Sequence, residues 1–418
     1  MPNFSVILPS KSKMGRYKEY MMENMEHPFQ NVPTHFVSIH LFKNKLLQDY
    51  ILKNGFDGVC HYTGDFTKVL PLKSIVIFIN DILSKYFGGP DNEAVGWDSG
   101  FEDDGDESTF HKELGGYIVP GNRKIYTDMN ELLYENNFVV DNEALLADIV
   151  DAFGEICLIQ RDPYGLTEDE ERFLDWRYIV ENTIKMSAEG MDFANIVKAE
   201  KVRLYGLLEA IQTAQTPLLK KIPLRLFRCV NYDSTKTPPV QFSDLTSPPI
   251  QYTKDLRMSK RGDSIFYGAI KKETAEEEAV KAASDSYVYI GTFETIHDLH
   301  ILDLTRIADN LSIFNQEQDS YYILVFLSQF CHEISLPVYN PTTEYIPTQL
   351  ITFYFRNCLK FYHQDESKSD LDGILYSSSK DHSVNAALFY DNTSSAKHLK
   401  LLEYEVMHEG LSKRYTYP

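Results

Sequence analysis

Basic residues gather in one stretch of a strongly acidic chain. Among the basic residues between 225 and 278 are five that could bind an anion together: Arg225, Arg228, Arg257, Lys260 and Arg261. The whole chain has 41 Lys and Arg against 61 Asp and Glu, so its formal net charge is −20. This charge disfavours general binding of nucleic acid, and an anionic ligand needs a local basic pocket. The stretch 225–278 is the densest candidate.

Arg228 lies within an apolar strand pattern made by Leu224, Leu226, Phe227 and Val230. A guanidinium in such a strand usually needs an anionic partner, and a pyrophosphate would suit it. An ion pair with one of the 61 carboxylates is the simpler explanation from this position alone. The segment from Arg257 to Ala269 is a basic turn that feeds a strand, and it reads equally well as an ordinary solvated turn.

Two further segments carry groups that could act on a ligand. Thr274 and Glu277 have the spacing of a capping box, which would occupy Glu277 at the start of a helix. Glu278 would then lie on the small-residue side of that helix, either at the edge of its buried face or aimed into a pocket. Farther on, Gly373–Ser377 predicts a strand that ends in hydroxyls, with Ser377, Ser378 and Ser379 in a row.

The elements that must position these groups fall into two halves. Apolar periodicity predicts helices over 41–54, 73–87, 141–153 and 192–214, and a capping box at Thr167 opens another that runs toward Met186. From Pro223 onward, short strands are expected at 224–230, 264–270, 286–293, 300–304 and 373–377. We therefore expect an α+β protein with a mainly helical domain at 1–220 and a second domain at 221–418.

Two loops are expected as well. Residues 91–107 hold eight carboxylates and no basic residue, which predicts a solvated acidic loop because the spacing does not match a calcium loop. The stretch between Asn231 and Pro249 contains two Pro-Pro pairs and is expected to be extended.

Composition narrows the class of protein. Five cysteines without a CxxC pair fit neither a disulfide framework nor a complete zinc site, and predict a reducing, cytoplasmic environment. A zinc site at Cys60 and His61 would require His35 and His40 to converge on them, so no metal is expected. The most apolar run without charges, 320–332, has 13 residues, where about 20 are needed to cross a membrane. No membrane partner is expected.

In order along the chain, these segments resemble the RES-domain family, whose members are toxin-like enzymes that consume NAD. The matching segments are Leu226-Phe227-Arg228, Arg257-Met258, Phe266-Tyr267-Gly268-Ala269, Glu273 through Glu278, and Gly373 through Ser378. Tyr345-Ile-Pro-Thr-Gln also resembles the run before the serine motif in a subgroup with a HEPN/RES N-terminal domain. The resemblance implies a fold like that of ADP-ribosyltransferases, a split and largely antiparallel sheet with flanking helices.

Carried over by position, the resemblance implies Arg257, Glu278 and Ser378 as catalytic residues, with Arg228, Tyr267 and Arg257 binding NAD. The alternative registers are Glu277 for the glutamate, and Ser377 or Ser379 for the serine. The implied reaction is cleavage of the nicotinamide N-glycosidic bond, as a NAD phosphorylase or NAD glycohydrolase. NAD is then a substrate, inorganic phosphate is a candidate co-substrate, and no other cofactor is expected.

The resemblance also implies partners and leaves alternatives. An enzyme that consumes NAD harms its own cell, so we expect restraint by an antitoxin or a regulatory protein, and an oligomer is compatible with the sequence. A protein acceptor would make the chain an ADP-ribosyltransferase, and an inert interaction protein is the alternative outside enzymes. The HEPN label suggests a ribonuclease with an Arg and a His on one helix, but the one match, Arg356 and His363, lies in the C-terminal half.

Overall fold

The computed structural model divides the chain into two compact units, which we describe separately. Unit 1 comprises residues 1–165 and 311–318, and unit 2 comprises 166–310 and 319–418. The structure describes residues 29, 32–89, 96–97, 109–111, 117–119, 124–161, 176–213, 218–233, 241–279, 286–307, 311–316, 318–335, 344–363, 367–378, 383–408 and 411–416. The expected boundary near residue 220 therefore falls inside unit 2, and a short later segment returns to unit 1.

Unit 1 combines helices with small antiparallel sheets. Its described helices include α2 (Lys45–Asn54), α3 (Leu72–Tyr86), α4 (Met129–Glu135) and α5 (Glu143–Phe153). Its described strands form three-stranded sheets. One has the order β1 (Phe36–Ser38), β3 (Phe66–Pro71), β2 (Phe56–Val59), and another has the order β4 (Phe87–Gly88), β9 (Leu158–Gln160), β8 (Ile125–Tyr126). A further one has the order β5 (Gly96–Trp97), β7 (Tyr117–Val119), β6 (Thr109–His111). The helices expected at 41–54, 73–87 and 141–153 are confirmed, whereas the first half is less purely helical than expected.

The segment 311–318 joins unit 1 through buried polar contacts. Asn44, which precedes α2, donates from Nδ2 to the carbonyl oxygen of Asn137 at 2.9 Å and to Oδ1 of Asn315 at 3.2 Å. Composition could not predict this return. The capping box at Thr167 and most of the acidic loop 91–107 lie outside the described residues.

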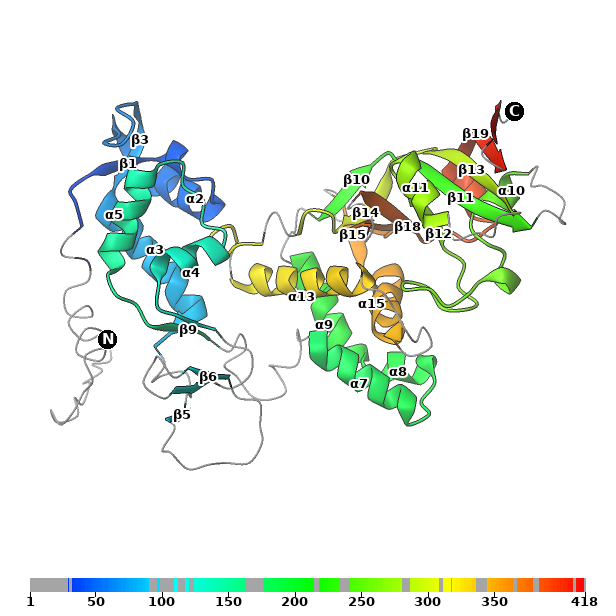
Figure 1. Cartoon of the computed structure of the whole chain (residues 1–418), viewed down its shortest axis with the longest axis horizontal. Helices are drawn as coiled ribbons and strands as arrows, with labels where there is room; N and C mark the ends of the chain where they lie inside the picture. Colours follow the sequence, from blue (N-terminus) through cyan, green and yellow to red (C-terminus); the bar gives the residue numbers. More distant parts are fainter. Residues whose placement is uncertain are drawn as a thin grey trace. The chain divides into compact units, whose positions relative to one another are not determined.

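Unit 2 is built on a nine-stranded sheet (Figure 1). The strand order is β10 (Leu219–Ile222), β14 (Leu299–Asp303), β17 (Gly373–Ser377), β18 (Val384–Leu388), β12 (Phe266–Ala269), β11 (Arg225–Asp233), β13 (Ser286–Thr295), β19 (Leu399–His408) and β20 (Leu411–Thr416). All neighbours pair antiparallel except β14 and β17, which run parallel. The five expected strands are therefore confirmed, and so is the α+β class.

Alternation along these strands separates the two faces of the sheet. One face carries an aromatic and aliphatic core, in which Phe293 packs edge-on against Phe266 at 5.2 Å and against Phe242 at 5.9 Å. Leu226 and Leu388 belong to the same core, and both are fully buried. Residues between these positions, such as Tyr267 on β12, point to the opposite face.

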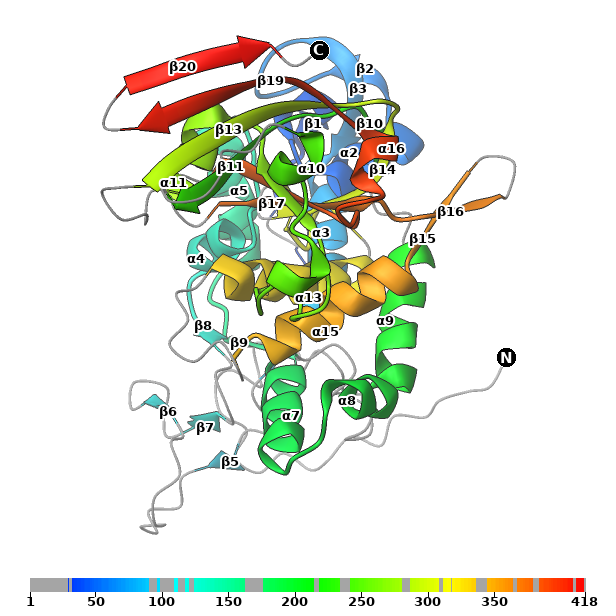
Figure 2. The same cartoon turned by 90° about the vertical axis from the view of Figure 1, so that its right-hand side faces the viewer.

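Helices cover the sheet from one side. Figures 1 and 2 show α13 (Gln318–Ser335) and α15 (Ile346–Asn357) against the sheet, with α7 (Trp176–Ala188), α8 (Phe193–Ala199) and α9 (Lys201–Thr213) beyond them. Trp176 packs edge-on against Phe326 and Phe330 of α13, and Tyr354 donates a 2.6 Å hydrogen bond to the carbonyl oxygen of Val197. These contacts explain why residues 176–213, expected in the first domain, belong to unit 2.

One loop prediction is wrong in part. The stretch between Asn231 and Pro249 was expected to be extended, but it contains the short helix α10 (Phe242–Leu245). Gln241 is the N-cap of this helix, and its backbone N–H donates a 3.1 Å hydrogen bond to Oδ2 of Asp244, so a local capping box outweighs the neighbouring prolines. Among the described helices, none is both long and apolar enough to cross a membrane.

Candidate active site

The site is organised around the junction of β11 and β12. These strands are joined through the pair Phe227–Ala269, whereas β11 pairs with β13 over nine positions. Gly268 lies at this junction, where an added Cβ atom would stand 2.9 Å from the Phe266 ring and 3.2 Å from the carbonyl oxygen of Phe227. A glycine is therefore required for the two strands to approach.

Arg228 spans this junction. Its Nε donates to the carbonyl oxygen of Thr246 at 3.0 Å and its Nη1 donates to that of Tyr267 at 2.6 Å. The guanidinium also lies over the Phe266 ring, 5.4 Å from the centroid. Because the surrounding protein excludes water, the pKa of Arg228 is lowered to about 10. No carboxylate within the described ranges pairs with it, so the ion pair favoured by its position alone is not found there.

Tyr267 connects the junction to the basic turn. Its hydroxyl donates to Oγ of Ser259 at 3.0 Å. Burial raises the pKa of Tyr267 above its ordinary value, and the hydrogen bond to Ser259 and the charge of Arg228 only partly oppose that effect. The phenol is therefore neutral over the physiological range.

Arg257 lies in that basic turn, two residues before Ser259. Its Nη1 donates to the carbonyl oxygen of Glu333 at 3.1 Å, and its guanidinium lies 5.9 Å from the centroid of the Tyr345 ring. As with Arg228, its partners are main-chain oxygens and an aromatic ring, and no described carboxylate pairs with it. The structure thus links Arg228, Tyr267, Ser259 and the Arg257 turn in one connected series.

The glutamate candidates lie on α11 (Lys272–Ala279), which packs on β11. The predicted capping box is wrong, because the helix begins at Lys272 and Thr274 is a fully buried residue inside it. The argument that a cap occupies Glu277 therefore fails. Glu277 is exposed, and Glu278 lies one residue farther along the helix, with its side chain outside the described part.

An ion network holds the start of α11. Lys272 donates to Oε2 of Glu405 at 2.7 Å, and Arg414 donates from Nε and Nη2 to Oε1 at 3.0 and 2.7 Å. Glu405 is 8% exposed. Burial acts to raise the pKa of Glu405, but the hydrogen bonds from Lys272 and Arg414 outweigh it and hold the pKa below its ordinary value.

Ser378 directly follows β17 and is 2% exposed. Its backbone N–H donates to the carbonyl oxygen of Ser383 at 2.7 Å, which closes the connection from β17 to β18. Ser377 ends β17 and is half-buried, and Ser379 lies outside the described residues. Ser378 is thus the more buried of the two described serines, and its role as the family serine stays a prediction.

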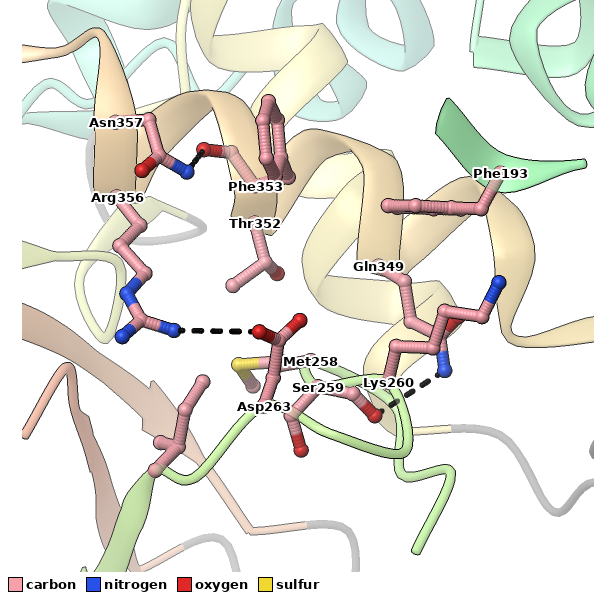
Figure 3. A pocket seen from close by; sticks show the side chains of 11 residues that line it. Phe193, Met258, Ser259, Lys260, Asp263, Gln349, Thr352, Phe353, Arg356 and Asn357 are labelled. Carbon is pink, nitrogen blue, oxygen red and sulfur yellow. Dashed lines mark hydrogen bonds and ion pairs between the residues drawn. The ribbon is translucent and has the colours of Figure 1, made fainter. Parts of the chain in front are cut away.

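A cavity of about 230 Å³ opens beside the basic turn (Figure 3). Arg356 on α15 faces Asp263 across it, with 3.9 Å between Nη1 and Oδ1, and Lys260 lies 4.8 Å from the centroid of the Phe193 ring. Sites for drug-sized ligands are usually about 300–1,000 Å³, so this cavity is smaller than a dinucleotide needs. It adjoins the series described above through Ser259 in its wall.

The alternative pair for a ribonuclease is not brought together. Arg356 faces Asp263, whereas Nε2 of His363 lies 2.7 Å from Oγ of Ser369 and its ring packs against His300. Across the described ranges, no group of three or more His, Cys, Asp or Glu side chains could hold a metal ion.

Sequence reasoning missed several residues that organise the site. Ser259 lies inside the basic turn that was singled out, but nothing in the pattern indicated its bond to Tyr267. Thr246 contributes only a carbonyl oxygen, which has no sequence signal. Thr348 and Gln349 contact the Arg257 turn, and their signal was the run Tyr345–Gln349, which resembled the family without an assigned role.

Comparison with family models gives two matches. Residues 53–188 match HEPN/RES N-terminal domain 1, and residues 225–407 match the RES domain. Comparison with the curated proteins gives no match. The RES match includes the strands β11 and β12, the basic turn, α11 and the serine connection.

Proposed function

Since the chain belongs to the RES-domain proteins that carry a HEPN/RES N-terminal domain, a family of toxin-like NAD-related enzymes, we propose that it cleaves the nicotinamide N-glycosidic bond of NAD. The acceptor is phosphate or water, which makes it a NAD phosphorylase or a NAD glycohydrolase.

One observation carries this proposal. Arg228 and Arg257 are both half-buried, and both are held by main-chain oxygens and aromatic rings in a chain with 61 carboxylates. Neither has a carboxylate partner among the described residues. A guanidinium held in place but not neutralised can bind a phosphate through its remaining N–H groups. The two arginines are therefore suited to the pyrophosphate of NAD.

The remaining candidates complete the site. Nicotinamide leaves as a neutral molecule because the bond to the ribose breaks with its electron pair going to the cationic ring, so no general acid is needed. Glu278 would stabilise the positive charge that develops on the ribose, and Ser378 would hydrogen-bond a ribose or phosphate oxygen. The neutral Tyr267 ring would pack against the nicotinamide riboside. Attack by an oxygen of hydrogen phosphate gives ADP-ribose 1-phosphate, and attack by water gives ADP-ribose and a proton; both release nicotinamide.

The junction between β11 and β12 supports the finer fold assignment. A single joining pair between the two halves of this largely antiparallel sheet is compatible with the split sheet implied by the resemblance to ADP-ribosyltransferases. Residues 1–220 would then be a regulatory segment, and a toxin–antitoxin or anti-phage setting with a restraining partner would fit an enzyme that depletes NAD.

The test is NAD loss and nicotinamide release by the purified full chain, with and without phosphate. We expect release by the wild type, at least 100-fold slower release by Glu278→Gln, and an unchanged rate for Glu273→Gln, an exposed control on the same helix. Phosphate dependence would indicate phosphorolysis. If free NAD persists but a protein acceptor becomes ADP-ribosylated, the transferase alternative holds, and if neither occurs the enzyme assignment fails.

A further inference from the structure

Two side chains in the first turn of α15 form hydrogen bonds to the loop that carries Arg257. Thr348 donates from Oγ1 to the carbonyl oxygen of Arg257 at 2.6 Å. Gln349 donates from Nε2 to the carbonyl oxygens of Leu256 at 2.9 Å and Ser259 at 3.2 Å. Three loop carbonyls in four residues are thus bound by two neighbouring side chains of one helix, and Figure 3 shows the contact between Gln349 and Ser259.

The loop segment that receives these hydrogen bonds, 256–259, is a tight turn. Leu256 and Ser259 form an antiparallel bridge, with hydrogen bonds of 2.8 and 3.3 Å between their backbone groups. Arg257 lies at the tip of this turn, so its backbone position depends on the two flanking residues. The ring of Tyr345, which precedes α15, lies near the Arg257 guanidinium. The same helix end therefore contacts both the backbone and the side chain of Arg257.

Thr348 and Gln349 are buried, with 4% and 5% of their surface exposed. Both partners of the Gln349 amide are carbonyls, so only its NH₂ group can make these bonds, which fixes the orientation of the amide. The helix itself is anchored, because Phe355 packs against Phe330 at 5.7 Å and Tyr354 bonds to Val197. The loop is thereby attached to a helix that is itself packed against other helices of unit 2.

We propose that Thr348 and Gln349 are positioning residues that hold Arg257 in the orientation that binds the anionic substrate. The inference rests on the proposed function for its kinetic part only. Arg257 is useful only where its N–H groups meet the phosphate oxygens, and a misplacement of about 1 Å in such a group can cost about 100-fold in rate. The run Tyr345–Gln349 thus positions a residue of the site without having to contact NAD itself.

The test uses Thr348→Val and Gln349→Leu in the full chain. The matched control is Thr352→Val, because Thr352 is a buried threonine one turn farther along α15 whose hydroxyl, among the described residues, bonds to the Thr348 carbonyl oxygen and to no loop carbonyl. We expect kcat/KM for NAD to fall about 10- to 100-fold in the first two variants, mainly through KM, and to stay near the wild-type value in the control. Thr348→Ser, which keeps the hydroxyl group, should have a kcat/KM near that of the wild type.

Two further measurements separate positioning from general destabilisation. In an Arg257→Ala background, Gln349→Leu should cause little additional loss, because its effect acts through Arg257. Without NAD, hydrogen exchange at the bridged amides of Leu256 and Ser259 should be faster in Thr348→Val and Gln349→Leu than in Thr352→Val. Unchanged exchange, or full additivity with Arg257→Ala, overturns the inference. If the wild type does not cleave NAD, the proposed function fails while the exchange result still decides whether the loop is held.

Discussion

Arg228 donates a hydrogen bond of 2.6 Å from Nη1 to the carbonyl oxygen of Tyr267. The bond crosses from β11 to β12 at the place where the two strands share one ladder pair. The same guanidinium reaches the carbonyl oxygen of Thr246, so it replaces missing ladder contacts with side-chain contacts. Among the described strands of this sheet, the junction therefore has the fewest ladder pairs, and it carries a cation.

Arg228→Lys should destabilise unit 2. A lysine cannot supply two N–H groups in the fixed geometry that reaches both carbonyl oxygens, so one buried acceptor loses its partner. We expect the free energy of unfolding to fall by about 1–3 kcal/mol, measured by urea denaturation. The control is Arg225→Lys on the same strand, because Arg225 is exposed. Equal stability of the two variants would contradict a bridging role for Arg228.

Tyr267→Phe and Ser259→Ala should be coupled. Each removes the same hydrogen bond, so the double variant should lose less free energy of unfolding than the sum of the single losses. We expect a coupling of about 1 kcal/mol, measured by denaturation of all four proteins. Strict additivity would mean that the two hydroxyl groups do not interact in solution.

Gly268→Ala should force β11 and β12 apart. The added Cβ atom would stand 2.9 Å from the Phe266 ring and 3.2 Å from the Phe227 carbonyl oxygen, and the second of these is backbone. We expect a loss of about 1–3 kcal/mol in the free energy of unfolding. Gly64→Ala in unit 1 is a comparison without steric conflict, because its Cβ would meet no atom within 4 Å and only its positive φ of 76° is unfavourable. A smaller loss at Gly268 than at Gly64 would argue against the close approach.

The ion network of Glu405 should make stability depend on pH in acid. The pKa of Glu405 is below its ordinary value in the folded state, so folding favours the ionised form. Its contribution is fully present above the ordinary pKa of about 4.3 and is lost as the pH falls through the folded pKa. The difference in melting temperature between wild type and Glu405→Gln should therefore be large at pH 7 and shrink as the pH falls below 4. Glu294→Gln, at an exposed position, should show no such change.

How far the sequence predicted this structure differs between strands and ends of helices. The strands of unit 2 follow from alternation, because Leu226 and Phe293 must face one core while their neighbours face the other side. Apolar periodicity likewise placed α2, α3 and α5. Strand alternation and helical periodicity are both local patterns, and both can be read from the sequence because apolar residues mark the buried positions.

The errors came from contacts between distant segments. Thr274 and Glu277 have capping-box spacing, but the helix begins at Lys272 because Thr274 is buried against the sheet rather than exposed at an end. The domain boundary expected near residue 220 is not among these errors, because the family models match 53–188 and 225–407 on either side of it. Contacts with distant segments nevertheless place residues 176–213 in unit 2, since Trp176 packs on Phe330 and Val197 bonds to Tyr354. No local pattern reports such pairings.

The sequence predicted side chains of the candidate site but not the main-chain groups that bind them. Arg228, Arg257 and Tyr267 were singled out, and the structure links them through the main-chain oxygen of Tyr267 and the hydroxyl of Ser259 in the Arg257 turn. Every residue has a main-chain carbonyl oxygen, so the residue type gives no indication that the carbonyl of Thr246 takes part in the site. The absence of a described carboxylate beside either arginine also needed the structure, because 61 candidate partners are present in the sequence.

The most direct test of the central claim is the rate of nicotinamide release from NAD by Arg257→Gln, compared with the wild type and with Arg261→Gln. Arg261 lies in the same turn with an exposed side chain, so it controls for loss of positive charge in this segment. The account predicts that kcat/KM falls at least 100-fold for Arg257→Gln, about 2.7 kcal/mol of transition-state stabilisation, and stays within about twofold for Arg261→Gln. Equal rates for the two variants, or no release by the wild type, would contradict it.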